Sequence, residues 1–127
     1  SAVTVLAANL LKAKGGSVMM DDIAIRYPTF TCDIAQQILR LLPYVGGRFH
    51  GIYHYSGEEA MTKFTMGMTM APLVGCDASQ CLPDHRPTPV PRPYDCHLST
   101  RKLRQTGLFV APTPFATALI KTLMVSH

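Results

Sequence analysis

Cysteine and histidine side chains in the second half of the chain stand at spacings that metal ions use. Four residues lie between Cys76 and Cys81, three lie between Cys81 and His85, and Cys96-His97 comes later. Zinc takes four sulfur or nitrogen ligands in a tetrahedron, and structural sites usually draw two of them from a tight Cys-x2–4-Cys turn. The spacing of Cys76 and Cys81 fits such a turn, whereas the spacing of His85 and Cys96-His97 does not fit a second one. We therefore predict reduced cysteines and no metal site, and keep a zinc-stabilised domain built on Cys76, Cys81, His85 and Cys96 as an alternative.

Positive charge gathers in the last third of the chain. Residues 86–127 contain six lysines and arginines and one acid, Asp95, whereas residues 1–85 contain six bases and seven acids. This imbalance favours a groove for a phosphate-bearing ligand or an acidic partner, and an ordinary solvated basic surface is equally compatible with it. The basic stretch has no stacking-aromatic motif, so we predict no nucleic-acid binding.

Length and hydropathy set the broad class. With 127 residues, 47% of them hydrophobic, the chain is long enough for one modest domain with one core, over residues 1–127. No apolar run approaches the roughly 20 residues of a membrane span, and no basic-then-apolar leader opens the sequence. We expect a cytoplasmic protein without membrane contact.

Four helices are predicted from apolar spacing and stop signals. Residues 2–13 carry helix formers and meet Gly15-Gly16. Residues 33–42 place apolar side chains at helical spacing before Pro43, with Thr31 as a candidate N-cap. Residues 59–74 form a methionine-rich helix whose methionines are expected in the core. A last helix begins at Pro114, with an apolar face made of Phe115, Ala118, Leu119 and Leu123.

The predicted strands are short. Residues 18–25 suggest extended pieces, and the alternation of residues 49–55 indicates a half-buried strand. Ser56 or Gly57 would then cap the next helix and place Glu58 and Glu59 in its first turn. Between residues 83 and 93, five prolines favour an extended segment across the surface.

Four strings resemble, in order and spacing, the C-terminal half of the extended short-chain dehydrogenase/reductases. Within that superfamily they are most similar to the branch that holds the dTDP-4-dehydrorhamnose reductases and the regulatory beta subunits of methionine adenosyltransferase. Together they cover nearly the whole chain. The strings are Ser1–Val5, Arg26-Tyr27-Pro28-Thr29 with Asp33-Ile34-Ala35, Tyr53–Lys63, and Arg92-Pro93 with Leu98 and Lys102-Leu103.

The resemblance implies an α/β fold, namely the C-terminal substrate-binding lobe of an extended short-chain reductase of the NAD(P)-binding Rossmann-like family. The N-terminal dinucleotide-binding half is missing from the pattern: the chain has no Gly-x-x-Gly-x-x-Gly turn. It also has no Tyr-x3-Lys pair, which serves hydride transfer in this family. The expectation is therefore no catalytic or cofactor-binding residue in this chain, and NADP(H) in the intact parent.

The resemblance also implies where a substrate would bind. In relatives, the segment after the Arg-Pro-Thr motif and the proline-rich stretch help to close the substrate cleft, which makes Arg26, Thr29, Arg86 and Arg92 the candidate substrate-binding residues. Arginine suits this role because its planar fork binds phosphate or carboxylate bidentately. Two ordinary alternatives stay open: Arg26 pairs with Asp33, and Arg92 is simply exposed.

Three functions follow from these patterns. The first is a fragment of a regulatory beta-subunit-like protein of S-adenosylmethionine synthesis, with the catalytic methionine adenosyltransferase subunit as its partner. The second is a fragment of a dTDP-4-dehydrorhamnose reductase-like enzyme. The third is a non-enzymatic module that binds an acidic partner through residues 86–104. If the chain is a fragment, loss of the other half would expose apolar side chains and favour a homodimer; the expected exposed residues are Leu6, Leu10, Leu119 and Leu123.

Overall fold

The computed structural model describes residues 1–125 and combines helices with a small parallel sheet. Its helices are α1 (Ala2–Lys12), α2 (Thr31–Leu41), α3 (Lys63–Leu73), α4 (Arg101–Arg104) and α5 (Phe115–Val125), with 3-10 turns at Leu42–Tyr44 and Ala78–Gln80. The strands are β1 (Val18–Asp21) and β2 (Cys81–Asp84), paired in parallel from Val18 opposite Cys81 to Asp21 opposite Asp84. The predicted α/β class is confirmed.

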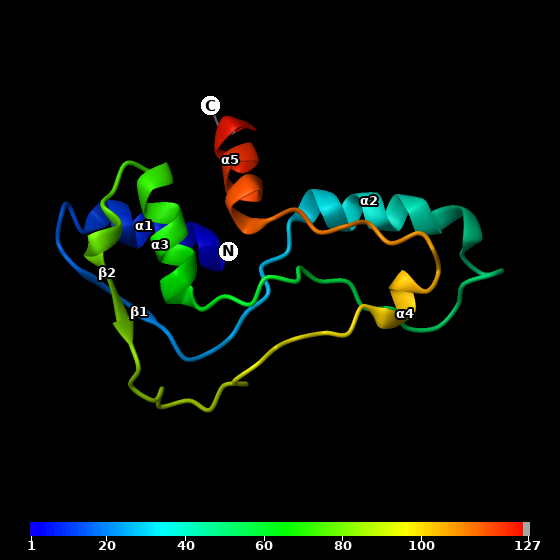
Figure 1. Ribbon diagram of the computed structural model, residues 1–127, viewed down its shortest axis with the longest axis horizontal. Helices are drawn as coiled ribbons and strands as arrows, with labels where there is room; N and C mark the ends of the chain where they lie inside the picture. The colour runs from blue at the N-terminus through cyan, green and yellow to red at the C-terminus, as the bar shows by residue number, and fades with distance from the viewer. Residues whose placement is uncertain (126–127) are drawn as a thin grey trace.

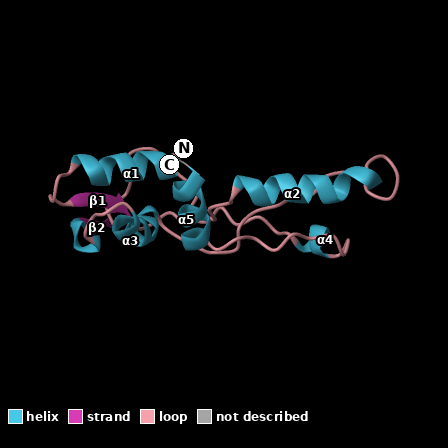
Figure 2. Ribbon diagram, turned by 90° about the horizontal axis from the view of Figure 1, so that it is seen from above, coloured by secondary structure: helices cyan, strands magenta, loops and turns pink. Residues whose placement is uncertain are grey.

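The core lies at one end of an elongated molecule (Figure 1). There α3 packs on both strands, and α1 and α5 pack on α3. Leu10 of α1 and Met70 of α3 are each 1% exposed. Gly67 lets α3 approach the sheet closely, because an added Cβ would come within 2.2 Å of the Met20 sulfur. Helices α2 and α4 extend away from this core toward the other end, as Figure 2 shows from above.

Three helix predictions hold closely. Helix α1 ends at Lys12, just before the glycines, and α5 begins directly after Pro114. The methionine-rich helix is real but starts at Lys63 rather than at residue 59. Its methionines Met66 and Met70 are buried in the core, as expected, whereas Met68 is exposed.

Helix α2 forms where it was predicted, but its polar side is buried and its apolar side is exposed. Its buried side chains are polar, Asp33 at 5% and Gln37 at 3% exposed, whereas its apolar side chains face outward, with Ile38 at 55% and Leu39 at 66% exposed. The expected Thr31 cap is wrong: Phe30 precedes the helix and makes no side-chain cap. The reason for the reversal is geometric, because α2 lies apart from the cluster formed by α1, α3 and α5 (Figure 1).

This reversal corrects the prediction of which apolar side chains are exposed. Leu6, Leu10 and Leu119 are core residues, and Leu123 is partly buried. Large exposed apolar side chains occur on several elements, among them Val5 and Leu11 of α1 and Ile120 and Met124 of α5. One group lies on α2 and the residues that follow it, and its members are Ile34, Ile38, Leu39, Leu42, Val45 and Ile52. We call this set the α2 apolar face.

The predicted strand over residues 49–55 is wrong. Residues 51–60 have no regular secondary structure among the described residues, since no neighbouring strand pairs with them. The cap of the following helix is Thr62, whose hydroxyl accepts from the Thr65 amide in a capping box, so Ser56 and Gly57 do not cap it. Glu58 and Glu59 therefore lie before the helix and serve other contacts.

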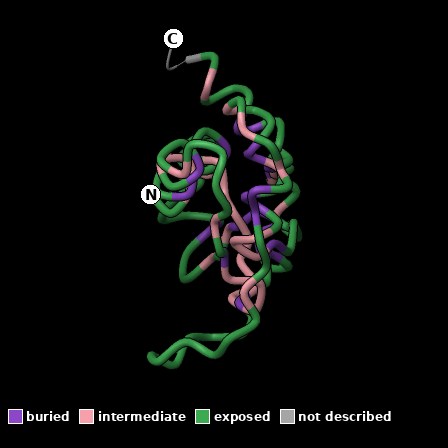
Figure 3. The backbone as a smooth tube through the Cα atoms, turned by 90° about the vertical axis from the view of Figure 1, so that its left-hand side faces the viewer, coloured by how far each residue is buried: buried purple, intermediate pink, exposed green. Residues whose placement is uncertain are grey.

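The proline-rich segment is exposed, as predicted, but only its start is a strand, because the chain bends at Arg86, Pro89 and Val90. It begins within β2, which includes Pro83, and continues through residues 85–93 without regular structure. In Figure 3 the loop at the bottom of the view is coloured as exposed, and it is the lower loop of Figure 1. No helix among residues 1–125 is long and apolar enough to cross a membrane.

Candidate ligand-binding cavity

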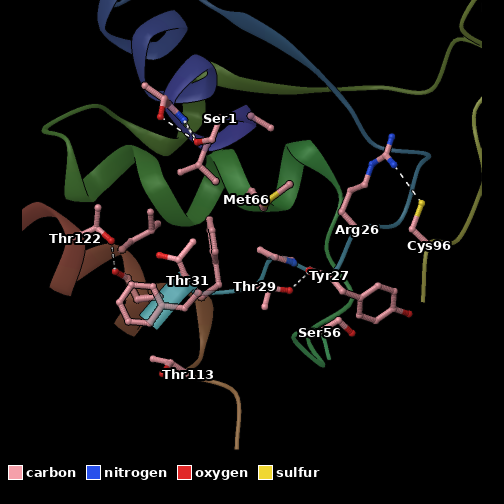
Figure 4. Close-up of a pocket in the computed structure, with 18 of the residues that line it drawn as sticks. Ser1, Arg26, Tyr27, Thr29, Thr31, Ser56, Met66, Cys96, Thr113 and Thr122 are labelled. Atoms are coloured by element: carbon pink, nitrogen blue, oxygen red, sulfur yellow. Dashed lines mark hydrogen bonds between the residues drawn. The ribbon is translucent and has the colours of Figure 1, made fainter. Parts of the chain in front are cut away.

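A cavity of about 660 Å³ opens between the N-terminal end of α1, the segment before α2, and helices α3 and α5 (Figure 4). This volume lies in the range typical of small-molecule sites. Its apolar wall includes Phe30, Met66, Leu98, Phe115 and Leu119. Its polar wall consists of Arg26, Tyr27, Thr29, Thr31, Tyr55, Ser56, Lys63, Thr113 and Thr122, together with Ser1 and Thr4.

The predicted residue Arg26 lies on this cavity. A bridge with Met61 holds its backbone, in which each residue's amide donates to the other's carbonyl. Its guanidinium donates to the Cys96 sulfur at 3.2 Å. Figure 4 shows the guanidinium turned toward Cys96 and away from Thr31, Thr113 and Thr122. The alternative that Arg26 pairs with Asp33 is therefore wrong.

The predicted residue Thr29 also lines the cavity, with a structural role. Its hydroxyl donates to the Tyr27 carbonyl at 3.0 Å and accepts from the Gly57 amide at 2.9 Å. The two segments touch so closely that a Cβ on Gly57 would lie 2.2 Å from the Pro28 carbonyl oxygen. Thr29 thus joins the segment before α2 to the Ser56-Gly57 turn and fixes one wall of the cavity.

The polar face of α2 positions another wall. Asp33 accepts from the Thr113 amide at 2.6 Å and from its hydroxyl at 2.8 Å. One turn later, Gln37 donates to the Leu108 carbonyl at 3.0 Å and accepts from the Val110 amide at 2.8 Å. Sequence analysis missed both residues. The available signal was polar side chains four apart, opposite the apolar stripe of the same helix.

Glu58 and Glu59, which were expected in the first turn of a helix, instead form hydrogen bonds with other segments of the chain. Glu59 accepts from the Phe115 amide at 2.6 Å, so its carboxylate sits at the N-terminus of α5, where negative charge is favoured. Glu58 accepts from His97, Thr100 and Arg104. Although burial alone would raise the pKa of Glu58, these three hydrogen bonds lower it below its usual value.

The charged side chains that line the cavity are all positive. Among the described residues that line it, the charged side chains are Arg26 and Lys63, and no aspartate or glutamate is among them. Partial burial and the nearby Asp95 carboxylate raise the pKa of Tyr27, so its phenol stays protonated at neutral pH. The cavity therefore offers cations and hydroxyl donors to a ligand, a pattern suited to an organic anion.

The predicted residues Arg86 and Arg92 lie outside this cavity, so the four candidate residues do not form one site. Arg86 makes a bidentate pair with Asp84, from Nε and one terminal nitrogen, both at 2.9 Å. These bonds lower the pKa of Asp84 to about 2. Arg92 is exposed within the proline-rich segment.

The described residues do not assemble the candidate metal ligands into one site. His85 bonds Asp22 at 2.9 Å and Cys96 accepts from Arg26, while Cys81 is buried in the core and Cys76 packs against it. No group of three or more histidine, cysteine or acidic side chains within residues 1–125 is placed to hold a metal ion.

The fold and its cavity define a substrate-binding lobe of α/β type. Residues 3–126 match the family model described as the RmlD substrate binding domain. The chain belongs to this family, within the extended short-chain dehydrogenase/reductases, and the resemblance inferred from its motifs is confirmed.

Individual relatives carry two kinds of name. The chain is 33% identical to methionine adenosyltransferase 2 subunit beta of Xenopus tropicalis, over 97% of this chain and 37% of that protein. It is 32% identical to the Danio rerio protein of the same name, over 94% and 38%. It is 28% identical to dTDP-4-dehydrorhamnose reductase of Mycolicibacterium smegmatis, over 80% and 32%. The chain thus spans about a third of the length of these relatives.

Proposed function

We propose that this chain acts as the substrate-side lobe of an NADP(H)-binding, reductase-like protein, and that the lobe performs no catalysis by itself. The observation that carries the proposal is the reversed helix α2. Its polar side chains Asp33 and Gln37 are buried inside the lobe, while Ile38 and Leu39 are exposed. Such a helix needs a second apolar layer on its outer side.

The dinucleotide-binding half is the layer that fits this role. The relatives extend over nearly three times the matched length, so each contains a large further region. The unpaired segment at residues 51–57 lies next to α2 in the chain and would give that region a strand to pair with. In this arrangement NADP(H) is held by the other half, and the cavity faces it with Arg26 and Thr29.

Within the family, we favour the regulatory type that supports S-adenosylmethionine synthesis in the cytoplasm. The relatives named methionine adenosyltransferase 2 subunit beta match 94 to 97% of the chain at 30 to 33% identity. The proposed partner is accordingly the catalytic methionine adenosyltransferase subunit. A sugar-nucleotide reductase is the second candidate, supported by 28% identity to the mycobacterial enzyme over 80% of the chain.

A third candidate, binding of an acidic protein without any cofactor, is supported by one surface. Arg101, Lys102 and Arg104 are exposed on the short helix α4. Two of them are already engaged, because Arg104 bonds Glu58 and Lys102 lies 4.2 Å over the Tyr53 ring. This surface therefore offers less free charge than the sequence suggests, and we rank this candidate below the others.

A chimera tests the proposal. Residues 1–127 replace the matched region of the Xenopus tropicalis beta subunit, and thermal unfolding is followed by circular dichroism with and without NADPH. We expect the melting temperature of the chimera to rise with NADPH and that of the isolated 127-residue chain to stay unchanged. The chimera should also co-purify with the catalytic methionine adenosyltransferase subunit.

Two results would contradict the proposal. A rise in melting temperature of the isolated chain with NADPH would mean that the lobe holds the cofactor itself. A folded chimera that neither responds to NADPH nor binds the catalytic subunit would remove the regulatory assignment. The unmodified Xenopus tropicalis subunit, taken through the same steps, is the control for both measurements.

A further inference from the structure

We propose that Lys63 is the anchor for the anionic group of the ligand that occupies the cavity, in preference to Arg26. The ligand class is an organic phosphate or carboxylate with an apolar or aromatic body. This inference rests on the proposed role of the cavity as a ligand site. It assigns the charge-recognising role to a residue outside the Arg-Pro-Thr motif.

The first observation is the state of the two cations. Arg26 has a partner, the Cys96 sulfur at 3.2 Å, and its guanidinium is turned toward it (Figure 4). Lys63 is the first residue of α3, is partly buried, and lines the cavity. Its ammonium takes part in no hydrogen bond, ion pair or ring contact within residues 1–125. A bound anion would supply this ammonium with a charged hydrogen-bond partner.

The second observation is the contrast between Lys63 and three cations elsewhere in the molecule. Arg86, Arg104 and Lys102 each have an acid, a carbonyl or a ring as partner. Glu59, four residues before Lys63, accepts from the Phe115 amide, and no ion pair among the described residues joins it to Lys63. The chain thus satisfies these cations and leaves Lys63 available on the cavity wall.

The third observation concerns the rest of the lining. No acidic side chain among the described residues of the wall competes for the Lys63 ammonium or repels an anion. The opposite wall is apolar, with Phe115 and Leu119 of α5 buried and in place. A ligand with a charged end and an apolar body therefore matches both walls of a cavity of about 660 Å³.

The test uses three probes of similar body and different charge: phenyl phosphate, benzoate and neutral benzyl alcohol. Binding to the 127-residue chain is followed by chemical-shift changes in two-dimensional NMR spectra. We expect one or both anions to bind at least about tenfold more tightly than benzyl alcohol, because a charge-assisted bond is worth that factor. The order of phenyl phosphate and benzoate then decides between phosphate and carboxylate.

Variants locate the anchor. Lys63→Met keeps the apolar stem and removes the charge, and should weaken anion binding at least about tenfold, with benzyl alcohol unaffected. Lys63→Arg should restore binding to within about threefold of the original chain. Lys12→Met is the matched control, since Lys12 is also a helical lysine but lies outside the cavity; it should change binding less than about twofold. Arg26→Met should change it less than about threefold.

Three results would overturn the inference. They are equal affinity for charged and neutral probes, an unchanged affinity in Lys63→Met, or a larger loss in Arg26→Met than in Lys63→Met. If Lys63→Met does not fold, the side-chain signals of Lys63 in the unsubstituted chain answer the question. They must shift on addition of the anion, and unmoved signals contradict the inference. The NADPH and co-purification results on the chimera are read separately, so the two proposals fail independently.

Discussion

Asp33, in the first turn of α2, holds Thr113 through two hydrogen bonds across 80 residues of sequence, one to the backbone amide at 2.6 Å and one to the hydroxyl at 2.8 Å. This contact ties the helix at one end of the molecule to the segment that leads into α5. Because Thr113 and Phe115 line the cavity, the shape of the site depends on a carboxylate that does not itself line it.

Replacing Asp33 with alanine should therefore destabilise the chain. The substitution leaves the Thr113 amide and hydroxyl without their acceptor, and hydrogen bonds to charged groups are the stronger kind. We expect a loss of about 2–3 kcal/mol in the free energy of unfolding, measured by urea denaturation. Gln36→Ala, on the exposed side of the same helix, should change it by less than about 0.5 kcal/mol. Equal effects of the two substitutions would contradict the assigned role.

A pair of leucine truncations tests where the core lies. Leu10 is buried in the core, so Leu10→Ala should cost about 3 kcal/mol of unfolding free energy through lost burial and the cavity left behind. Leu39, on the α2 apolar face, should lose less than about 0.5 kcal/mol on the same substitution in the isolated chain. Thermal or urea unfolding gives both values. A cost above about 1 kcal/mol for Leu39→Ala would mean that the face is already covered, for instance by a second copy.

Gly57→Ala tests the junction between Thr29 and the Ser56-Gly57 turn. The new methyl group would lie 2.2 Å from the Pro28 carbonyl oxygen, and a backbone atom cannot move aside easily. We expect a loss of about 1–3 kcal/mol in stability, as for overpacking elsewhere in proteins. Gly47→Ala is the matched control, because its added Cβ would meet its nearest atom only at 3.8 Å. A Gly57→Ala chain as stable as the control would refute the close contact.

The Asp84–Arg86 pair predicts a specific pH dependence. The hydrogen bonds from Arg86 lower the pKa of Asp84 to about 2, below its ordinary value of 3.8. A depressed carboxyl pKa stabilises the fold above the ordinary value, and that contribution is lost as the pH falls from about 4 toward 2. Arg86→Gln should return the pKa of Asp84 toward 3.8, as followed by carbon-detected NMR titration of its carboxyl group. Arg92→Gln should leave it unchanged, and a pKa that stays near 2 in Arg86→Gln would show that another group lowers it.

Local sequence patterns predicted where the helices lie, but not which side of each helix is buried. Helices α1 and α5 could be predicted from helix-forming residues, the glycines after α1 and Pro114 before α5. These signals depend only on residues close in the sequence. The direction in which α2 faces does not follow from its own periodicity. Its stripe of isoleucine and leucine shows that one side of the helix packs on something apolar. That side is buried in this chain only if its packing partner belongs to the same chain. The strand expected at residues 49–55 was wrong for a related reason, since a strand needs a neighbour to pair with.

The candidate site was predicted in part. Arg26 and Thr29 were chosen from a family motif and lie on the cavity, whereas Arg86 was chosen from the same resemblance and is paired with Asp84. No local pattern indicates that Asp84, two residues away, would take its guanidinium. The contacts of Asp33 and Gln37 join segments more than 70 residues apart, so only the folded chain reveals them.

Hydrogen–deuterium exchange over α2 tests the central claim, that the α2 apolar face packs on a dinucleotide-binding half, most directly. The isolated 127-residue chain and the chimera with the Xenopus tropicalis beta subunit are compared under the same conditions. We predict that the amides of residues 34–41 exchange at least about tenfold more slowly in the chimera, because the outer face of α2 is then covered. Equal exchange rates in a folded chimera would contradict the claim.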